Sequence, residues 1–557
     1  MNRFSLFLFS CFLLAAQYSC AQPLSQKTSF TRQDSLRGTL NANRTWWDVT
    51  RYDIEVTPDF NTKTLSGSTA FSFKVTTANP GGMMQLDLQE PMIIDSIIQK
   101  SSAGGNHTSS AAPRSFSFKR DGNAWLVATG NAFKDSGQLV VYFHGKPREA
   151  INPPWDGGWI WKRDAQGRPW MSVAVQGLGA SAWYPCKDHQ SDEPERGASI
   201  TIHVVDTLVA VANGHLKSQS RQNGTAAYTW EVANPINNYN IVPYIGKYVN
   251  WSETYAGEKG PLDCSYWVLD YNLDKAKKQF EQTKLMLKAF EYWFGPYPFY
   301  EDGFKLVESP HLGMEHQSAV AYGNKFGNGY LGRDLSGSGW GLKWDFIIIH
   351  EAGHEWFANN ITTKDIADMW VHEGFTSYSE ALFTEYYYGK EAANAYVQGI
   401  RKNIKNDIPI IGPYGVNQEG SGDMYYKGSN MIHTIRQVIN DDDKFRQILR
   451  GLNSTFYHQT VTTQQVEDYI TQQSGKDLKK VFDQYLRNTS IPVLELAYDK
   501  GALKYRWNNC IEGFNMPVKL TNGQWLQPTT RWYQTKLEKT AFDKINADPN
   551  FYITVKK

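Results

Sequence analysis

The strongest indication of local structure in this sequence is a His-Glu-Ala-Gly-His run at residues 350–354, inside the apolar stretch 345–358. The stretch is apolar enough to predict a buried helix, and residues four apart share one face of a helix. Both imidazoles can therefore point at one metal ion, with Glu351 close enough to hold the water that the ion activates. Gly353 costs a helix about 1 kcal/mol relative to alanine, so we expect a tight helix crossing or a close approach of substrate there.

A third metal ligand is predicted at Glu373, in the run Trp-Val-His-Glu-Gly-Phe at 370–375 that starts a second expected helix. Three protein ligands leave one coordination position open, which is typical of catalytic rather than structural zinc. We therefore predict one Zn²⁺ per chain, held by His350, His354 and Glu373, and hydrolysis by a metal-activated water. The alternative, two helix-surface histidines and an ordinary glutamate, does not explain the motif together with its third ligand.

Three other histidines lie near these residues in the sequence: His311, His316 and His372. No spacing argument makes any of them a ligand. His372 directly precedes Glu373 and so faces about 100° away from it on a helix. We expect all three to pack the site or to support it indirectly.

The metal motif, with its third ligand after eighteen intervening residues, resembles the aminopeptidase N family of zinc metallopeptidases, which are gluzincins, and so do stretches outside it. They are Trp-Tyr-Pro-Cys-Lys-Asp at 183–188, Phe-Gly-Pro-Tyr-Pro-Phe at 294–299 and the aromatic pair at 356–357. The resemblance covers about residues 45–490. It implies a zinc-dependent aminopeptidase that removes N-terminal residues from peptide substrates with a free N-terminus.

The resemblance also implies a substrate-binding run at residues 312–316, Leu-Gly-Met-Glu-His, which departs from the family's Gly-x-Met-Glu-Asn at its first and last positions. In the family this glutamate receives the substrate's α-amino group. A carboxylate suits an ammonium in a site that a metal otherwise makes positive. By resemblance Glu315 has this role, and Gly313 and Met314 bind substrate beside it.

Three further residues are predicted to act at or near the site: Tyr425, Gln176 and Glu380. Tyr-Tyr-Lys-Gly at 425–428 resembles the family's Tyr-x-Lys-Gly, which implies that Tyr425 donates a hydrogen bond to the oxyanion of the tetrahedral intermediate. Gln176 stands near the spacing at which the family places a residue lining the first substrate pocket. Glu380, seven residues after Glu373 and so on the same helix face, either supports a zinc histidine or is a solvated helix glutamate.

The pattern along the chain predicts a multidomain α+β protein. Residues 43–250 carry short alternating runs broken by Gly, Asn and Pro, which predict an N-terminal β-sandwich or saddle. Residues 251–490 change to helical spacing and predict a mainly helical catalytic domain, thermolysin-like by resemblance. Residues 491–557 return to strand-like runs and predict a small C-terminal β-sandwich. The larger family members add a C-terminal helical domain that we expect this chain to lack, so that a partner or loops such as 324–341 would close the cleft.

The first residues predict export. Residues 1–21 combine a short positive start, an apolar core over 4–16 that is too short to span a bilayer, and a small-x-small cleavage site. This signal peptide implies a periplasmic or extracellular location, with lipid anchoring at Cys20 as a minor alternative. Residues 22–42 are polar and predict a loose leader. No later run of about 18 apolar residues predicts a transmembrane segment.

Composition limits the partners. A formal net charge of +1 does not suit a nucleic-acid partner, and 14% aromatic residues do not suit a disordered chain. Three cysteines follow the expected signal peptide: Cys186, Cys264 and Cys510. Their odd number and wide spacing predict no disulfide framework, although one bridge stays open.

Three alternatives to the aminopeptidase remain. A zinc metalloendopeptidase would use the same chemistry without Glu315 and would cut N-acetylated peptides as readily as free ones. The family's epoxide-hydrolase side activity has no residue here that specifically supports it. A catalytically silent peptide-binding or scaffold protein of the same fold would bind zinc and turn over nothing, and the intact ligands, Glu351 and Tyr425 argue against it.

Overall fold

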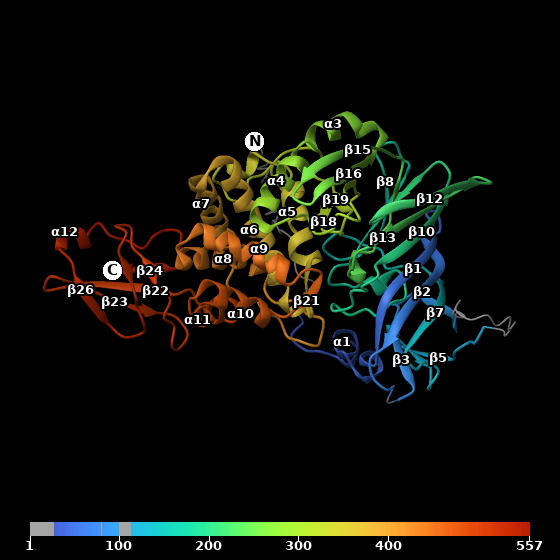
Figure 1. Cartoon of the computed structure of the whole chain (residues 1–557), viewed down its shortest axis with the longest axis horizontal. Coiled ribbons are helices and arrows are strands. Elements are labelled where there is room, and N and C mark those ends of the chain that lie inside the picture. Colours follow the sequence, from blue (N-terminus) through green and yellow to red (C-terminus); the bar gives the residue numbers. More distant parts are fainter. Residues whose placement is uncertain (1–26, 80, 100–112) are drawn as a thin grey trace, which may run out of the picture.

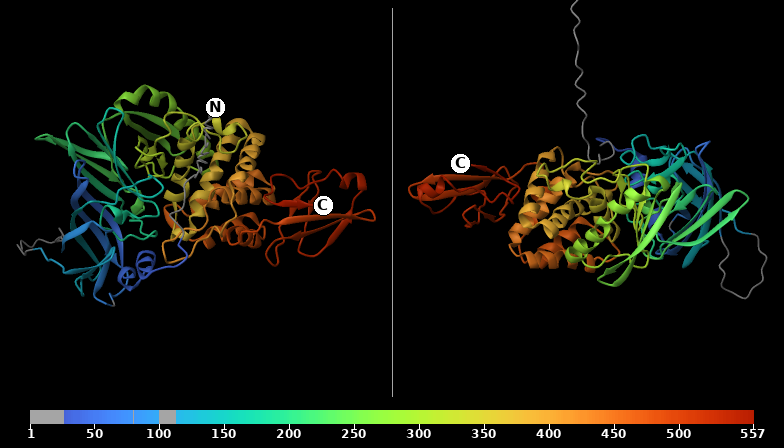
Figure 2. Two further views of the ribbon diagram at one scale, coloured as in Figure 1. Left: turned by 180° about the vertical axis from the view of Figure 1, so that it is seen from behind. Right: turned by 90° about the horizontal axis from the view of Figure 1, so that it is seen from above.

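The computed structural model describes residues 27–79, 81–99 and 113–557. These residues form an N-terminal, a central and a C-terminal part, which follow one another along the chain. Two β-rich parts lie at opposite ends of an elongated molecule, with the helices between them (Figure 1 and Figure 2). Among these residues no helix is long and apolar enough to cross a membrane. The expected signal peptide, residues 1–21, lies outside the described ranges.

The N-terminal part is built from three sheets, the largest with seven strands in the order β12-β13-β10-β1-β2-β7-β4. Strand β10 alternates buried and less buried residues throughout, which is the pattern of a strand that covers a core with one face. The strands of the large sheet are β1 Trp47–Asp59, β2 Thr64–Val75, β4 Ile93–Gln99, β7 Ser136–Gly145, β10 Ala198–Val205, β12 His215–Gln222 and β13 Thr225–Val232. Those of the two smaller sheets are β3 Met83–Asp87, β5 Phe118–Asp121, β6 Ala124–Ala128, β8 Gly158–Arg163, β9 Pro169–Ala174, β11 Val209–Val211 and β14 Tyr244–Gly246.

The expected loose leader is ordered where the structure describes it. Helix α1, Arg32–Gly38, starts with a capping box between Thr31 and Asp34, and α2, Ala42–Thr45, follows. Arg37 pairs with the buried Asp188 at 2.9 Å. A Cβ on Gly38 would lie 2.3 Å from the backbone nitrogen of Asn417. The expectation was wrong for these residues because distant parts of the chain hold them in place.

The central part places a five-stranded sheet, β15-β16-β17-β19-β18, beside a group of helices. The strands are β15 Tyr248–Gly257, β16 Gly260–Leu269, β17 Phe304–Glu308, β18 Gly313–Met314 and β19 Val320–Tyr322. The helices are α3 Leu273–Gln279, α4 Gln282–Phe294, α5 Phe346–Gly353, α6 Trp370–Tyr388, α7 Lys390–Gly399, α8 Tyr426–Ile439, α9 Asp442–Thr455, α10 Thr463–Ser474 and α11 Lys479–Leu486. One short parallel pair, β20 Ile361–Thr363 with β21 Gln459–Val461, ties the helices together.

The C-terminal part is a four-stranded sheet, β26-β23-β22-β27, with a separate hairpin of β24 and β25. Its elements are β22 Val493–Asp499, β23 Ala502–Asn508, β24 Val518–Lys519, β25 Trp525–Leu526, β26 Tyr533–Lys536, α12 Lys539–Phe542 and β27 Thr554–Lys556. Its apolar residues join the same core cluster as the central helices. Within the described ranges Cys186, Cys264 and Cys510 are all free thiols.

Candidate metal centre and active site

Helix α5 contains His350, and His354 is its C-cap residue. Asp345 caps its N-terminus by accepting hydrogen bonds from the backbone nitrogens of Ile347 and Ile348, and the apolar run that follows is buried. A Cβ on Gly353 would lie 2.7 Å from Ser379 Oγ, on α6. The glycine therefore permits a tight crossing of α5 and α6, which is one of the two reasons expected for it.

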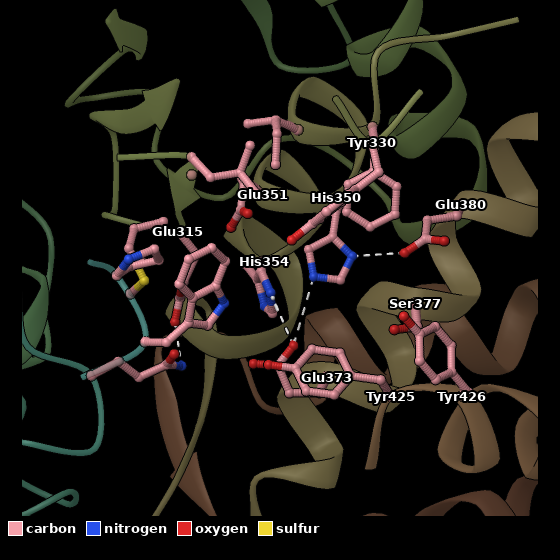
Figure 3. A pocket seen from close by; sticks show the side chains of 18 residues that line it. Glu315, Tyr330, His350, Glu351, His354, Glu373, Ser377, Glu380, Tyr425 and Tyr426 are labelled. Carbon is pink, nitrogen blue, oxygen red and sulfur yellow. Dashed lines mark hydrogen bonds and ion pairs between the residues drawn. The ribbon is translucent and has the colours of Figure 1, made fainter. Parts of the chain in front are cut away.

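The crossing brings His350, His354 and Glu373 together (Figure 3). One carboxylate oxygen of Glu373, Oε2, lies 3.4 Å from His354 Nε2 and 3.7 Å from His350 Nε2. It is buried and has no hydrogen-bond partner among the described residues. Ligands about 2.1 Å from a tetrahedral zinc lie roughly 3.4 Å apart. These spacings, and the unsatisfied buried oxygen, fit a zinc ion held by the three side chains.

Neighbouring groups orient both imidazoles through their other nitrogen. His350 Nδ1 lies 2.7 Å from Glu380 Oε1, and Tyr396 donates to the other oxygen of Glu380 at 2.5 Å. His354 Nδ1 lies 3.0 Å from the carbonyl oxygen of Phe357. Such contacts leave Nε2 of each ring for the metal. Of the two readings of Glu380, the structure therefore places it against a zinc histidine rather than in solvent.

The replacement Glu380→Gln is expected to weaken zinc binding about 10- to 100-fold, because the neutral amide polarises His350 less than a carboxylate does. Competition with a chromogenic chelator measures the affinity directly. The matched control is Glu391→Gln, at an exposed position of α7. Equal zinc affinity of Glu380→Gln and the unchanged protein would contradict the supporting role.

Glu351 lies on the same helix with β18 packed against it. A Cβ on Gly313 would lie 2.6 Å from Glu351 Oε1, so a larger residue at this position would force the carboxylate to move. Burial raises the pKa of Glu351 to about 7, against the opposing effect of His350 and His354. A carboxylate with a pKa near the working pH is suited to accept and return a proton.

Glu315 directly follows β18 and is 2% exposed. The amide of Gln176 donates to Glu315 Oε1, and the Tyr239 hydroxyl donates to the same oxygen at 3.1 Å. Asn359 holds the backbone carbonyl of Glu315 at 2.8 Å. Two residues inferred separately from the sequence, Gln176 and Glu315, are therefore in contact, in the same cavity as the metal ligands.

Tyr425 precedes α8 and lies next to the metal ligands because α6 and α8 approach closely. A Cβ on Gly428 would lie 3.1 Å from the Cα of Gly374, the neighbour of Glu373. The ring of Tyr425 stacks over His350 with 6.1 Å between centroids. Burial and nearby carboxylates raise the pKa of Tyr425 well above 10. Its hydroxyl therefore stays protonated and is able to donate a hydrogen bond.

All ten residues predicted for the site line one cavity. It also has walls that the sequence analysis missed: Pro154, Trp155, Leu312, Tyr330, Phe346, Ile347, Ser377 and Tyr426. The spacing of Phe346, one helical turn before His350, was a usable signal for one of them. Trp155 and Tyr330 come from irregular loops and carried no periodic signal.

The other three histidines lie outside the metal cluster. His316 Nδ1 lies 2.5 Å from the hydroxyl of Tyr244. His311 Nε2 lies 3.4 Å from Ser172 Oγ, and His372 accepts a hydrogen bond from the backbone nitrogen of Thr363 at 2.9 Å. All three are buried packing residues, as expected.

Comparisons with known proteins agree with this geometry. Residues 278–485 match the peptidase family M1 domain. Mitochondrial aminopeptidase 2 of Saccharomyces cerevisiae is 21% identical over 537 residues, which is 90% of this chain and 54% of that protein. Human aminopeptidase B is 23% identical over 449 residues, 76% of this chain and 65% of that protein. Leukotriene A-4 hydrolase of Xenopus laevis is 22% identical over 61% of this chain and 57% of its own length. The chain thus spans about half to two thirds of the length of these relatives.

Among solved structures, the M1 zinc metallopeptidase of Deinococcus radiodurans has a TM-score of 0.65 and 20% identity, covering 81% of this chain and 96% of that one. This similarity confirms the multidomain α+β fold and its helical central part. The matched range 278–485 contains Glu315, Glu351, Tyr425 and all three zinc ligands. The chain therefore carries a peptidase family M1 domain in the fold of the M1 zinc metallopeptidases.

Proposed function

We propose that this chain is a zinc-dependent aminopeptidase that hydrolyses N-terminal residues from peptides. The observation that carries the proposal is Glu315, an almost fully buried carboxylate beside the metal ligands in the cavity. A carboxylate in such a place binds a substrate ammonium strongly, because a charge-assisted hydrogen bond gains strength away from water. The names of the yeast and human relatives, both aminopeptidases, support the same conclusion.

The chemistry follows from the arrangement of the side chains. Zinc held by His350, His354 and Glu373 supplies a Lewis acid that polarises the scissile carbonyl and lowers the pKa of water. Glu351 accepts the proton of the attacking water and passes it to the leaving amine. Tyr425 donates a hydrogen bond to the oxyanion.

The position of Glu315 sets where the peptide is cut. Its carboxylate binds the free α-amino group, so that only the first peptide bond reaches Glu351 and the zinc ligands. Gln176 fixes the orientation of that carboxylate and, with Gly313 and Met314, borders the first residue of the substrate. A longer peptide without a free amine has no group to pair with Glu315.

A panel of fluorogenic aminoacyl amides tests the proposal, each offered with a free and with an N-acetylated amine, before and after chelation of the metal. Free substrates should be cleaved, blocked ones should not, and chelation should abolish turnover. Glu315→Gln is expected to lower kcat/KM for free substrates about 10- to 100-fold, the loss of a hydrogen bond to a charged group, whereas Glu391→Gln should not.

The panel also separates the competing functions. Equal hydrolysis of blocked and free substrates would indicate an endopeptidase and contradict the aminopeptidase proposal. A zinc-loaded protein that turns over none of them would indicate a silent peptide-binding protein.

A further inference from the structure

The cavity has two sides, separated by the zinc ligands. Glu315 lies on one side of the His350, His354 and Glu373 cluster, and Tyr330, Ser377 and Tyr426 lie on the other (Figure 3). The contacts agree with the view, since Glu315 is held by Gln176 of the N-terminal part, whereas His350 is held by Glu380 of α6. The proposed aminopeptidase chemistry gives no role to Tyr330, Phe346 or Tyr426 on the second side.

Aromatic rings form the walls of that second side. Tyr330 meets Phe346 edge to face, with 5.2 Å between ring centroids, and Phe346 stacks on His350 at 5.0 Å. Tyr425 and Tyr426 continue the series at the start of α8, with 6.4 Å between their rings. Rings from a loop, α5 and the start of α8 thus enclose one space, with Ile347 as a further apolar neighbour.

The charges of the cavity point to an uncharged occupant. Its lining, within the described part of the chain, contains no lysine or arginine. The one carboxylate on the second side, Glu380, is already engaged by His350 and Tyr396. An acidic side chain would find no cation there, and a basic one would have to compete for a carboxylate with two existing partners.

The direction of a bound peptide identifies the occupant. If Glu315 holds the α-amino group and the first peptide bond lies at the zinc ligands, the chain continues past them toward Tyr330, Phe346 and Tyr426. We propose that these three rings form the subsite for the second residue of the peptide and favour an aromatic side chain there. Aromatic rings pair favourably edge to face and in offset stacks, and a site of this shape leaves unfilled space around a small residue. This inference rests on the proposed aminopeptidase function.

Tripeptides that differ only in the second residue test it: Leu-Phe-Ala, Leu-Ala-Ala and Leu-Glu-Ala, with release of free leucine measured by mass spectrometry. We expect kcat/KM for Leu-Phe-Ala to exceed that for Leu-Ala-Ala at least about 10-fold, and Leu-Glu-Ala to be the poorest of the three. Tyr330→Ala should bring the first two values together, while Tyr330→Phe, which keeps the ring, should preserve their ratio.

Two controls make the outcome decisive. Tyr142→Ala changes an exposed position of β7 in the large N-terminal sheet and should leave the ratio unchanged. Zinc content should be equal in all variants. Equal kcat/KM for Leu-Phe-Ala and Leu-Ala-Ala, or an unchanged ratio in Tyr330→Ala, would overturn the subsite alone. Release of leucine from none of the tripeptides by the zinc-loaded protein would overturn the aminopeptidase function and the subsite together.

Discussion

Replacing Glu351 with glutamine is expected to lower kcat about 10²- to 10⁴-fold while leaving one zinc ion bound per chain. Glutamine has nearly the same shape as glutamate, so the close contact with Gly313 and the crossing of α5 and α6 should persist. What the amide lacks is the capacity to accept the proton of water and return it to the leaving amine. The defect should therefore appear in the chemical step and not in metal content.

Two measurements on the same preparation separate these effects. Metal analysis gives the zinc stoichiometry, and hydrolysis of a free aminoacyl amide under saturating conditions gives kcat. Glu380→Gln provides the complementary pattern, since it should lower zinc affinity and, once saturated with zinc, recover much of the activity. Glu351→Gln should recover nothing with added zinc. Normal turnover of the glutamine variant would show that Glu351 is not the base.

The part of the site that the sequence predicts best is local. His350 lies in α5 and His354, four residues later, is its C-cap residue and keeps α-helical dihedral angles, so helical geometry puts the two on one face. Glu380 could be placed on the face of Glu373 for the same reason, but its partner could not be named. That partner, His350, lies on another helix, and only the crossing of α5 and α6 brings the two together.

Long-range geometry explains where the predictions from sequence fall short. The buried helix expected in the apolar stretch 345–358 ends as α5 at Gly353, and the chain soon leaves helical conformation, with Ala358 at a φ of 149°. The departure turns the carbonyl oxygen of Phe357 back toward His354. Likewise, the helical spacing expected within residues 251–490 is interrupted near Phe280, where α3 ends and α4 begins, and the Phe280 ring is buried against Tyr322. In both places a tertiary contact outweighs a local periodic pattern.

The aromatic side of the cavity shows the same limit in the site itself. From the sequence alone, Phe346 is one more apolar residue of a buried helix, and Tyr330 is a loop residue. Their meeting edge to face is a property of the folded chain alone. Residues that hold the metal and perform proton transfer are thus more predictable than residues that select the substrate, because the former need fixed spacings and the latter need only a surface of suitable shape.

Replacing Tyr425 with phenylalanine is expected to lower kcat about 10²- to 10³-fold with little change in KM or zinc content. The phenol is a neutral donor, held protonated by burial, and an oxyanion accepts its hydrogen bond far more strongly than the uncharged carbonyl of the substrate does. The variant keeps the ring that stacks on His350, so the metal ligands should stay in place. Removing the hydroxyl should therefore destabilise the transition state and leave substrate binding unchanged.

The split between kcat and KM distinguishes this role from that of Glu315, whose loss should raise KM because the ammonium is bound before and during the reaction. Steady-state kinetics on one free aminoacyl amide measure both variants, with Tyr533→Phe, exposed on β26, as the matched control. Should Tyr425→Phe raise KM and leave kcat unchanged, the hydroxyl would be a substrate-binding group. The oxyanion would then depend on the metal alone, and Tyr425 would join Glu315 in positioning the peptide.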